Sequence, residues 1–157
     1  MVVQCTSLAR PSKRRSEIMR AVPRTRTAPE QRVTALLRTL GCRYRTNRKS
    51  LPGSPDIVLR DASVAIFVHG CFWHRHECRA GRSTPTSNQQ FWLRKFRENR
   101  SRDRRQCKAL REMGYQVFVI WECQTKPSAR NALANRLTRM LGRVGLSKPG
   151  RIIRASP

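Results

Sequence analysis

The chain has 157 residues, a length that predicts one domain with a single modest hydrophobic core. Its 34 lysines and arginines against nine acidic residues give a formal net charge of +25, which resists compaction and favours a polyanionic partner, nucleic acid above all. No apolar run approaches the ~20 residues of a membrane span, and no basic helix carries a broad apolar face, so a membrane partner is not expected.

Residues 1–15 are polar and basic without periodicity, and we expect a disordered arm there. The arm lacks the order of a signal peptide, which predicts a cytoplasmic protein. In that compartment the six cysteines are expected to be thiols or metal ligands rather than disulfides.

A first helix is predicted from Pro29 to Leu40. Its apolar residues recur at i, i+3, i+4 and i+7 and form one stripe: Val33, Leu36, Leu37 and Leu40. Thr27 can cap this helix with Glu30 three residues on, in a capping-box arrangement, and Gly41 is a natural stop.

Short strands are predicted next. Residues 42–48 begin in an extended form, and Leu-Pro-Gly-Ser-Pro at 51–55 is a turn. Two β-branched runs, 56–59 and 63–68, are typical of a hairpin. The stretch HGCFWHRHEC at 69–78 fits neither the helical nor the strand period, and residues 79–88 are predicted to form a loop.

The second half alternates helix and strand. A long helix is predicted from Gln89 to Met113, a buried strand from Tyr115 to Trp121, and a short helix from Ser128 to Leu141 with a loose basic tail. The order of elements predicts an α/β domain around a small central mixed sheet flanked by helices.

A metal site is predicted around the histidine-rich stretch. Cys71, His76 and Cys78 lie within eight residues, and neighbouring strand ends in a mixed sheet would bring Cys123 to them. Thiolates with one imidazole suit tetrahedral Zn²⁺, and four protein ligands make a structural site. Spacing alone leaves His74 as an alternative to His76, and it leaves open that Cys71 and Cys78 are free buried thiols.

A hydrolytic site is the second prediction. Asp56 stands at the start of a strand, and with Glu30 it could supply the oxygen ligands that Mg²⁺ prefers, although Glu30 could serve only the capping box. Asp103 falls on the apolar face of the long helix, where a carboxylate needs a partner. That partner is either an arginine or a histidine, and His74 or His69 could be that histidine, oriented to take a proton from water.

Four stretches together resemble the very short patch repair (Vsr) endonuclease family: SLPGSPDIVL, AIFVHGCFWHRHEC, FWLRKFRENRSRDRR and GYQVFVIWEC. The resemblance runs from Ser16 to Cys123. It implies a restriction-endonuclease-like fold of the PD-(D/E)XK type, and an enzyme that nicks one DNA strand on the 5′ side of the thymine in a T:G mismatch left by deamination of 5-methylcytosine. It also implies a catalytic Mg²⁺ and one structural Zn²⁺.

The resemblance assigns a role to each site residue. Asp56 and the backbone carbonyl of Val68 would hold Mg²⁺, while Glu30 and His69 would hold water around it. His74 would be the general base and Asp103 its orienting carboxylate. The zinc ligands would be Cys71, His76, Cys78 and Cys123. The superfamily's lysine is missing from Val68-His69-Gly70, which makes a histidine base chemically sensible near neutral pH.

The aromatic pair Phe72 and Trp73 would enter the DNA beside the mismatch, helped by Met19 from the other groove, because a mismatched step is easily opened. The pair could instead be core residues. The resemblance further implies a monomer at the prokaryotic nucleoid, with mismatch-repair proteins as partners. It divides the chain into an arm (1–15), an endonuclease domain (16–125) and a C-terminal helix with a tail (126–157).

Two rival functions remain at this stage. A non-catalytic, zinc-stabilised DNA-binding module fits the charge, the zinc ligands and the aromatic pair, but leaves Asp56 and Asp103 unexplained. A related nuclease with a different DNA target fits all of these residues.

Overall fold

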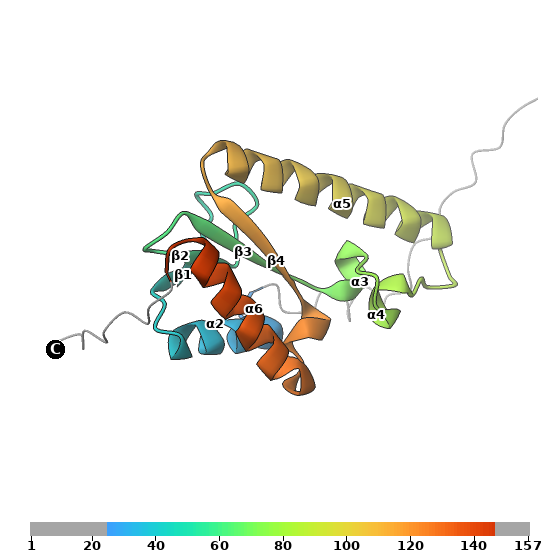
Figure 1. Cartoon of the computed structure of the whole chain (residues 1–157). Helices are drawn as coiled ribbons and strands as arrows, with labels where there is room; N and C mark the ends of the chain where they lie inside the picture. Colours follow the sequence, from blue (N-terminus) through green and yellow to red (C-terminus); the bar gives the residue numbers. More distant parts are fainter. Residues whose placement is uncertain (1–24, 147–157) are drawn as a thin grey trace, which may run out of the picture.

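The computed structural model describes residues 25–146, and a four-stranded sheet in the order β1-β2-β3-β4 lies at its centre (Figure 1). Strands β1 (Tyr44–Thr46), β2 (Ile57–Leu59) and β3 (Val64–His69) are antiparallel neighbours, and β4 (Gln116–Trp121) runs parallel to β3. The α/β class with a mixed sheet is therefore confirmed. The narrower restriction-endonuclease-like class stays a prediction.

The parallel pairing of β3 with β4 decides where the cysteines lie. His69 at the end of β3 pairs with Trp121 at the end of β4. Cys71 and Cys123 each follow their strand end by two residues, so this register carries both to the same edge of the sheet. The strand ends meet there because the crossover between β3 and β4 returns the chain in the same direction.

Helices cover both faces of the sheet (Figure 1). Helices α2 (Ala28–Thr39) and α6 (Arg130–Arg143) pack on one face, and α5 (Gln89–Glu112) packs on the other. The larger core joins α2 and α6 to alternate strand residues: Val33, Leu36, Leu37, Ile57, Leu59, Val64, Ile66, Ile120, Leu133, Leu137, Met140 and Leu141. The intervening residues Ala65 and Phe67 face the opposite way and pack with Leu110 of α5, as the two-residue period of a strand requires.

The first helix begins as predicted. The Thr27 hydroxyl oxygen accepts a hydrogen bond from the Glu30 N–H at 3.5 Å, and the Thr27 hydroxyl donates to Glu30 Oε1 at 2.7 Å. Glu30 Oε2 accepts from the backbone N–H of Arg26 at 2.9 Å. Thr27 therefore caps the helix as predicted, but the reciprocal half of the predicted capping box is absent, because Glu30 accepts from the Arg26 N–H and the Thr27 hydroxyl instead of the Thr27 N–H. These bonds fix the Glu30 carboxylate.

Two predictions about the segment after β3 were wrong. A helical turn, α3 (Cys71–His74), replaces part of the stretch predicted to be irregular, and another, α4 (Arg79–Arg82), replaces part of the predicted loop. Four-residue turns are too short to show a helical period. α3 packs on the distant α5 and α4 packs on α3, and a local pattern does not register such contacts.

The last helix is preceded by two 3₁₀ turns. They are η1 (Glu122–Thr125) and η2 (Pro127–Ala129), so α6 begins two residues later than predicted. Within residues 25–146 no helix is both long and apolar enough to cross a bilayer. Met19, the predicted N-terminal arm and the tail from residue 147 lie outside the described residues.

Candidate functional site

Two groups of polar side chains lie next to each other where β3 and β4 end. The cysteine cluster consists of Cys71, His76, Cys78 and Cys123, and the histidine–carboxylate cluster consists of His69, His74 and Asp103. Trp121 separates them: its ring stacks on His76 with centroids 4.5 Å apart and meets His69 edge-on at 5.5 Å. The Trp121 ring therefore contacts both clusters, and no residue belongs to both of them.

The cysteine cluster has the donor set and the size of a zinc site. Its four ligand atoms lie within 4.8 Å of one another, with His76 Nδ1 at 3.5 Å from Cys123 Sγ and 3.9 Å from Cys71 Sγ. A tetrahedron with Zn–S bonds of about 2.3 Å requires ligand separations of roughly 3.8 Å. Three sulfurs and one imidazole favour Zn²⁺ over harder cations, which prefer oxygen. His76 rather than His74 completes the group.

The backbone around His76 is built for this arrangement. Arg75 takes a left-handed conformation at φ 57° and ends α3, so that His76 turns back and donates its N–H to the Cys71 carbonyl at 3.1 Å. Gly81 in α4 packs directly on the His76 backbone, and a Cβ at that position would overlap the His76 carbonyl. The close approach of α4 to the cluster therefore requires a glycine.

The cysteines are unequal before a cation binds. Burial raises the pKa of the Cys71 thiol to about 12, whereas the hydrogen bond with His76 lowers the pKa of Cys78 to about 6. Near neutral pH, Cys78 therefore carries a negative charge and Cys71 does not. A divalent cation would let both sulfurs ionise, because ligand binding displaces thiol protons.

The histidine–carboxylate cluster joins the end of β3, the end of α3 and the middle of α5. His74 Nδ1 lies 2.5 Å from Asp103 Oδ2, and both side chains are largely buried. Of the two histidines that the sequence left open as partners, His74 is the one that contacts Asp103. One turn earlier on α5, the Asn99 side chain donates to the Trp73 carbonyl at 3.0 Å and fastens α3 to the helix.

The charges of this cluster follow from its contacts. Burial by itself would raise the pKa of Asp103, but the hydrogen bond with His74 and the charges of His74, His69 and Arg102 outweigh it, and the pKa is lowered. An ionised Asp103 only accepts hydrogen bonds, so His74 Nδ1–H must be the donor, which leaves Nε2 free to accept a proton.

His69 stacks face to face on His74, with ring centroids 3.8 Å apart and planes at 11°. Burial first, and then the neighbouring His74, lower the pKa of His69 to about 4. His69 is consequently neutral near pH 7.

Asp56 lies at the start of β2, next to this cluster. Its Oδ2 accepts the backbone N–H of Val68 at 2.7 Å. Burial raises the pKa of Asp56 to about 6, and the nearby Glu30 carboxylate adds to the rise, against the opposing effects of Val68 and His74. A half-buried carboxylate close to the buried Glu30 carboxylate is an arrangement that a cation would relieve.

The Val68 carbonyl faces the same space. The Ser63 carbonyl accepts a hydrogen bond from the Gln116 N–H of β4. Because backbone N–H and C=O groups alternate in direction along a strand, odd-numbered residues of β3 turn theirs towards β4, and even-numbered residues turn theirs towards β2. Val68 therefore turns its N–H and its carbonyl to the side of Asp56. The register of the hairpin, Ile57 with Ile66, places Pro55 opposite Val68, and proline has no N–H to offer that carbonyl.

The aromatic pair is neither core nor fully exposed. Phe72 meets Trp73, Trp92 and Phe96 edge-to-face, with centroids between 5.2 and 5.4 Å, and both members of the pair are half-buried. Trp92 and Phe96 belong to the first turns of α5. The pair thus packs against the rings of Trp92 and Phe96 and remains partly exposed to solvent.

The sequence analysis missed three residues that help to position the two clusters: Asn99, Gly81 and Trp121. Asn99 gave a signal, since it is a polar residue on the buried face of α5, but it received no role. Gly81 and Trp121 gave none, because their importance lies in contacts with His76 from other elements.

Comparisons with known proteins agree with one another. The family model described as DNA mismatch endonuclease Vsr matches residues 9–80. The Type II nicking enzyme V.XorIIP of Xanthomonas oryzae is 44% identical over 128 residues, covering 82% of this chain and 92% of the relative. The DNA mismatch endonuclease Vsr of Escherichia coli is 40% identical over 126 residues, covering 78% and 80%. The Type II nicking enzyme V.NmeAIP of Neisseria meningitidis is 42% identical over 128 residues, covering 80% and 90%.

Proposed function

The chain belongs to the DNA mismatch endonuclease Vsr family, and on that premise we propose that it nicks one strand of duplex DNA on the 5′ side of the thymine in a T:G mismatch. Such mismatches arise when 5-methylcytosine is deaminated, and the nick begins repair back to C:G. The named activities of the relatives support the nicking of DNA. The choice of T:G is the part of the proposal that experiment must establish.

One observation carries the catalytic proposal: His74, which contacts Asp103, also lies within electrostatic reach of the half-buried carboxylate of Asp56. These residues come from α3, α5 and the start of β2. A general base held by a carboxylate next to an oxygen-rich cation site is what metal-assisted phosphodiester hydrolysis needs.

The proposed cation site uses Asp56 and the carbonyl of Val68. A carboxylate and a backbone carbonyl are hard oxygen donors, and their placement on one side of β3 fits Mg²⁺, which keeps several waters. Mg²⁺ bound there would stabilise the negative charge that develops on the phosphate. Glu30 and His69 are proposed to hold water around it, and the bonds of Glu30 with Arg26 and Thr27 keep its carboxylate fixed.

The proposed reaction is an in-line displacement at phosphorus. His74 Nε2 removes a proton from the attacking water while Nδ1–H stays bonded to Asp103, which stabilises the imidazolium that forms. The new bond joins the water oxygen to phosphorus, and the bond to the bridging deoxyribose oxygen breaks. That oxygen leaves with a proton from solvent, and His74 returns its proton afterwards.

Recognition is proposed to come from the aromatic pair. The cysteine cluster, holding Zn²⁺, fixes the segment on both sides of Phe72 and Trp73, so the two rings can open the mismatched step without first being ordered. Met19 is proposed to enter from the other groove. The arm at 1–15, the endonuclease domain at 16–125 and the segment at 126–157 remain our proposed division. The PD-(D/E)XK fold class, the monomeric state, the repair-protein partners and the location at the nucleoid are likewise proposals.

The experiment is single-turnover cleavage of end-labelled duplexes with Mg²⁺ or with a chelator. We expect a nick in the thymine strand of a T:G duplex, and at least 100-fold slower cleavage of matched T:A and C:G duplexes. Binding to the T:G duplex without any nick would favour the non-catalytic module. Equal cleavage of a matched site would favour the related nuclease with another target, an alternative kept open by the nicking-enzyme names of two relatives.

A further inference from the structure

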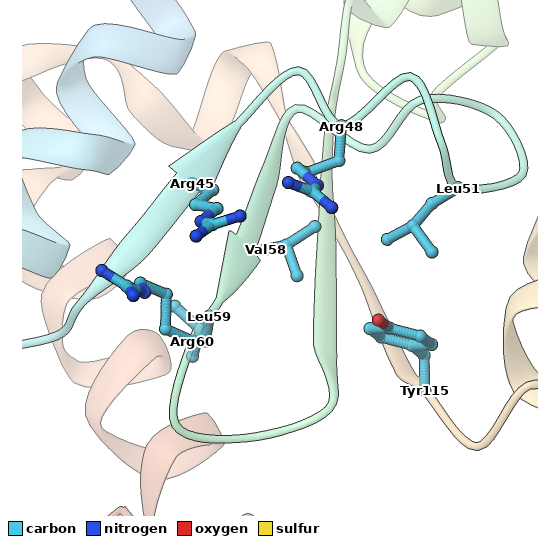
Figure 2. A pocket seen from close by; sticks show the side chains of 7 residues that line it. All are labelled: Arg45, Arg48, Leu51, Val58, Leu59, Arg60 and Tyr115. Carbon is cyan, nitrogen blue, oxygen red and sulfur yellow. The ribbon is translucent and has the colours of Figure 1, made fainter.

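Three arginines line a pocket of about 290 Å³ that takes no part in the site described above. Arg45 comes from β1, Arg48 from the loop that follows it, and Arg60 from the turn after β2. Figure 2 shows Arg45 and Arg48 extending over Val58, with Arg60 on one side and the apolar faces of Leu51 and Tyr115 on the other. The pocket thus has a cationic rim and an apolar floor.

The pocket lies on the same face of the sheet as α5. Val58 pairs with Ala65, and Ala65 packs on Leu110 of α5. The flanking Ile57 and Leu59 belong to the core on the other face, although Leu59 also lines part of the pocket. Asp56 precedes Val58 by two residues, roughly 7 Å along a strand. One residue of the pocket floor, Val58, therefore lies two residues along the chain from the carboxylate proposed to hold the cation.

Hydrogen bonds of the loop join the backbone of Arg48 to the backbone just before β2. The Arg48 N–H donates to the Pro55 carbonyl at 3.3 Å, and the N–H of the preceding Asn47 donates to the Asp56 carbonyl at 3.0 Å. The backbone of Asn47 and Arg48 is thus hydrogen-bonded to that of Pro55 and Asp56. Its guanidinium reaches one partner among the described side chains, the Ser50 hydroxyl at 3.3 Å.

No direct ion pair neutralises the pocket arginines among residues 25–146, although the Asp61 carboxylate, next to Arg60 in the chain, acts on Arg60 electrostatically. Arg43, on the same strand as Arg45, is paired with Asp61. Within residues 25–146, by contrast, no carboxylate lies within salt-bridge distance of Arg45, Arg48 or Arg60. Like charges gathered in one pocket repel, and an apolar floor strengthens the field above it, so the pocket attracts an anion.

We propose that this arginine pocket binds the sugar–phosphate backbone of the DNA next to the scissile phosphate, a proposal that rests on the endonuclease function proposed above. Guanidinium groups bind phosphate oxygens in a bidentate manner, and the floor of Val58, Leu51 and Tyr115 suits the apolar face of a deoxyribose. Contacts of this kind set the register of the protein on the duplex and carry no base information. The pocket would therefore hold the strand in line with Asp56 and His74 whatever the flanking sequence.

The competing explanation concerns the edge of the sheet. β1 is an edge strand, and charged side chains on an edge discourage pairing with a second molecule. That explanation covers Arg45 but not Arg48 and Arg60, which lie outside the strands. It predicts self-association of variants without any change in their affinity for DNA.

The test compares Arg45→Ala, Arg48→Ala, Arg60→Ala and the triple variant with a control, Arg139→Ala. Arg139 is exposed on α6, which covers the opposite face of the sheet, so the control removes the same charge away from the pocket. Binding to the T:G duplex is measured without divalent cation across a range of salt concentrations. Each lost phosphate contact should lower the slope of log K against log salt by about 0.9, so the triple variant should lose about 2 to 3 units. The control should change the slope little, and Arg→Lys variants should keep it.

A scan of the duplex with single neutral methylphosphonates then locates the contacts. Wild type should lose affinity when the neutral group replaces a phosphate near the nick, and the triple variant should be insensitive at those same positions. If the triple variant keeps the wild-type slope and scan while wild type nicks the duplex, the pocket proposal is overturned and the nuclease stands; self-association with an unchanged slope overturns it as well. If wild type binds but nicks nothing, and the triple variant still loses slope, the pocket stands as a DNA site and the nuclease fails.

Discussion

The cysteine cluster and the histidine–carboxylate cluster lie at the same edge of the sheet with one tryptophan between them, yet they use opposite chemistry. The first brings together three sulfurs and one imidazole, which would fill all four positions of a tetrahedral ion and leave none for a substrate. The second combines oxygen donors with an imidazole that has a free nitrogen, and it lies beside Asp56. The difference teaches that neighbouring groups with metal-binding side chains would have different roles, because the donor atoms and the open ligand positions favour a structural cation at one and hydrolytic chemistry at the other.

The largest effect is expected from a substitution in the cysteine cluster, which tests whether that cluster binds zinc and stabilises the fold. Cys78→Ser should abolish stoichiometric zinc binding and lower the melting temperature by at least 10 °C, because a structural zinc site contributes to folding directly. DNA binding and nicking should fall together. Zinc analysis and thermal melting provide the readouts, and Cys107→Ser, which removes a half-buried thiol from α5 outside the cluster, is the control that should retain zinc. A Cys78→Ser protein with full zinc content and normal melting would assign no structural role to the cluster.

Asp56→Asn should give the largest loss of rate among variants that keep their fold. Removing the carboxylate from the proposed cation site should slow single-turnover nicking at least 1000-fold, since a cation ligand stabilises several kcal/mol of transition-state charge. Asp61→Asn, at an exposed carboxylate paired with Arg43, should leave the rate unchanged. Near-normal nicking by Asp56→Asn would place the reaction elsewhere.

The same variant should be no less stable than wild type. The folded-state pKa of Asp56, about 6, lies above the ordinary value of 3.8, so its contribution to stability is present below pH 3.8 and is lost as the pH rises through 6. The cost at pH 8 without metal is of the order of 2 to 3 kcal/mol, and asparagine removes it. A lower melting temperature for Asp56→Asn at pH 8 would contradict this accounting.

The base and its partner should act as a unit. His74→Ala should slow nicking about 100-fold to 10,000-fold, and Asp103→Asn should cause a similar or smaller loss. The double variant should be barely slower than His74→Ala, because the two side chains serve one proton transfer. Zinc content should remain at the wild-type level in all three proteins. Additive losses would mean that Asp103 acts independently of His74.

The pH dependence should show a smaller effect. Nicking at limiting Mg²⁺ should fall as the pH drops below about 6, because Asp56 must be ionised to bind a cation and its pKa is raised to about 6. Higher Mg²⁺ concentrations should move this limb to lower pH, since the cation competes with the proton. An acid limb that is independent of Mg²⁺ would assign it to another group.

Much of this arrangement could be predicted from the sequence. The cap at Thr27, the long helix through Asp103 and the strand that leads to Cys123 all follow from local pattern and strand alternation. The missing parts depend on contacts between distant residues. Nothing local reveals that His74 rather than His69 reaches Asp103, or that Gly81 packs on His76.

The arginine pocket shows the same limit. Arg45, Arg48 and Arg60 are three of 34 basic residues, and only the register of β1 with β2 brings them over one floor. Tyr115 joins that floor from the segment before β4, far away in the sequence. Composition therefore predicted an anionic partner without showing where on the sheet it would bind.

The most direct test of the division between the clusters uses the three histidines of the chain. Mn²⁺ replaces Mg²⁺ in sites built from oxygen donors and broadens nearby imidazole resonances. In zinc-loaded protein titrated with Mn²⁺, we predict that the His69 and His74 ring signals broaden at lower concentration than the His76 signal, and that Asp56→Asn removes the difference. Broadening of His76 first would contradict the account, because it would place the exchangeable cation at the cysteines.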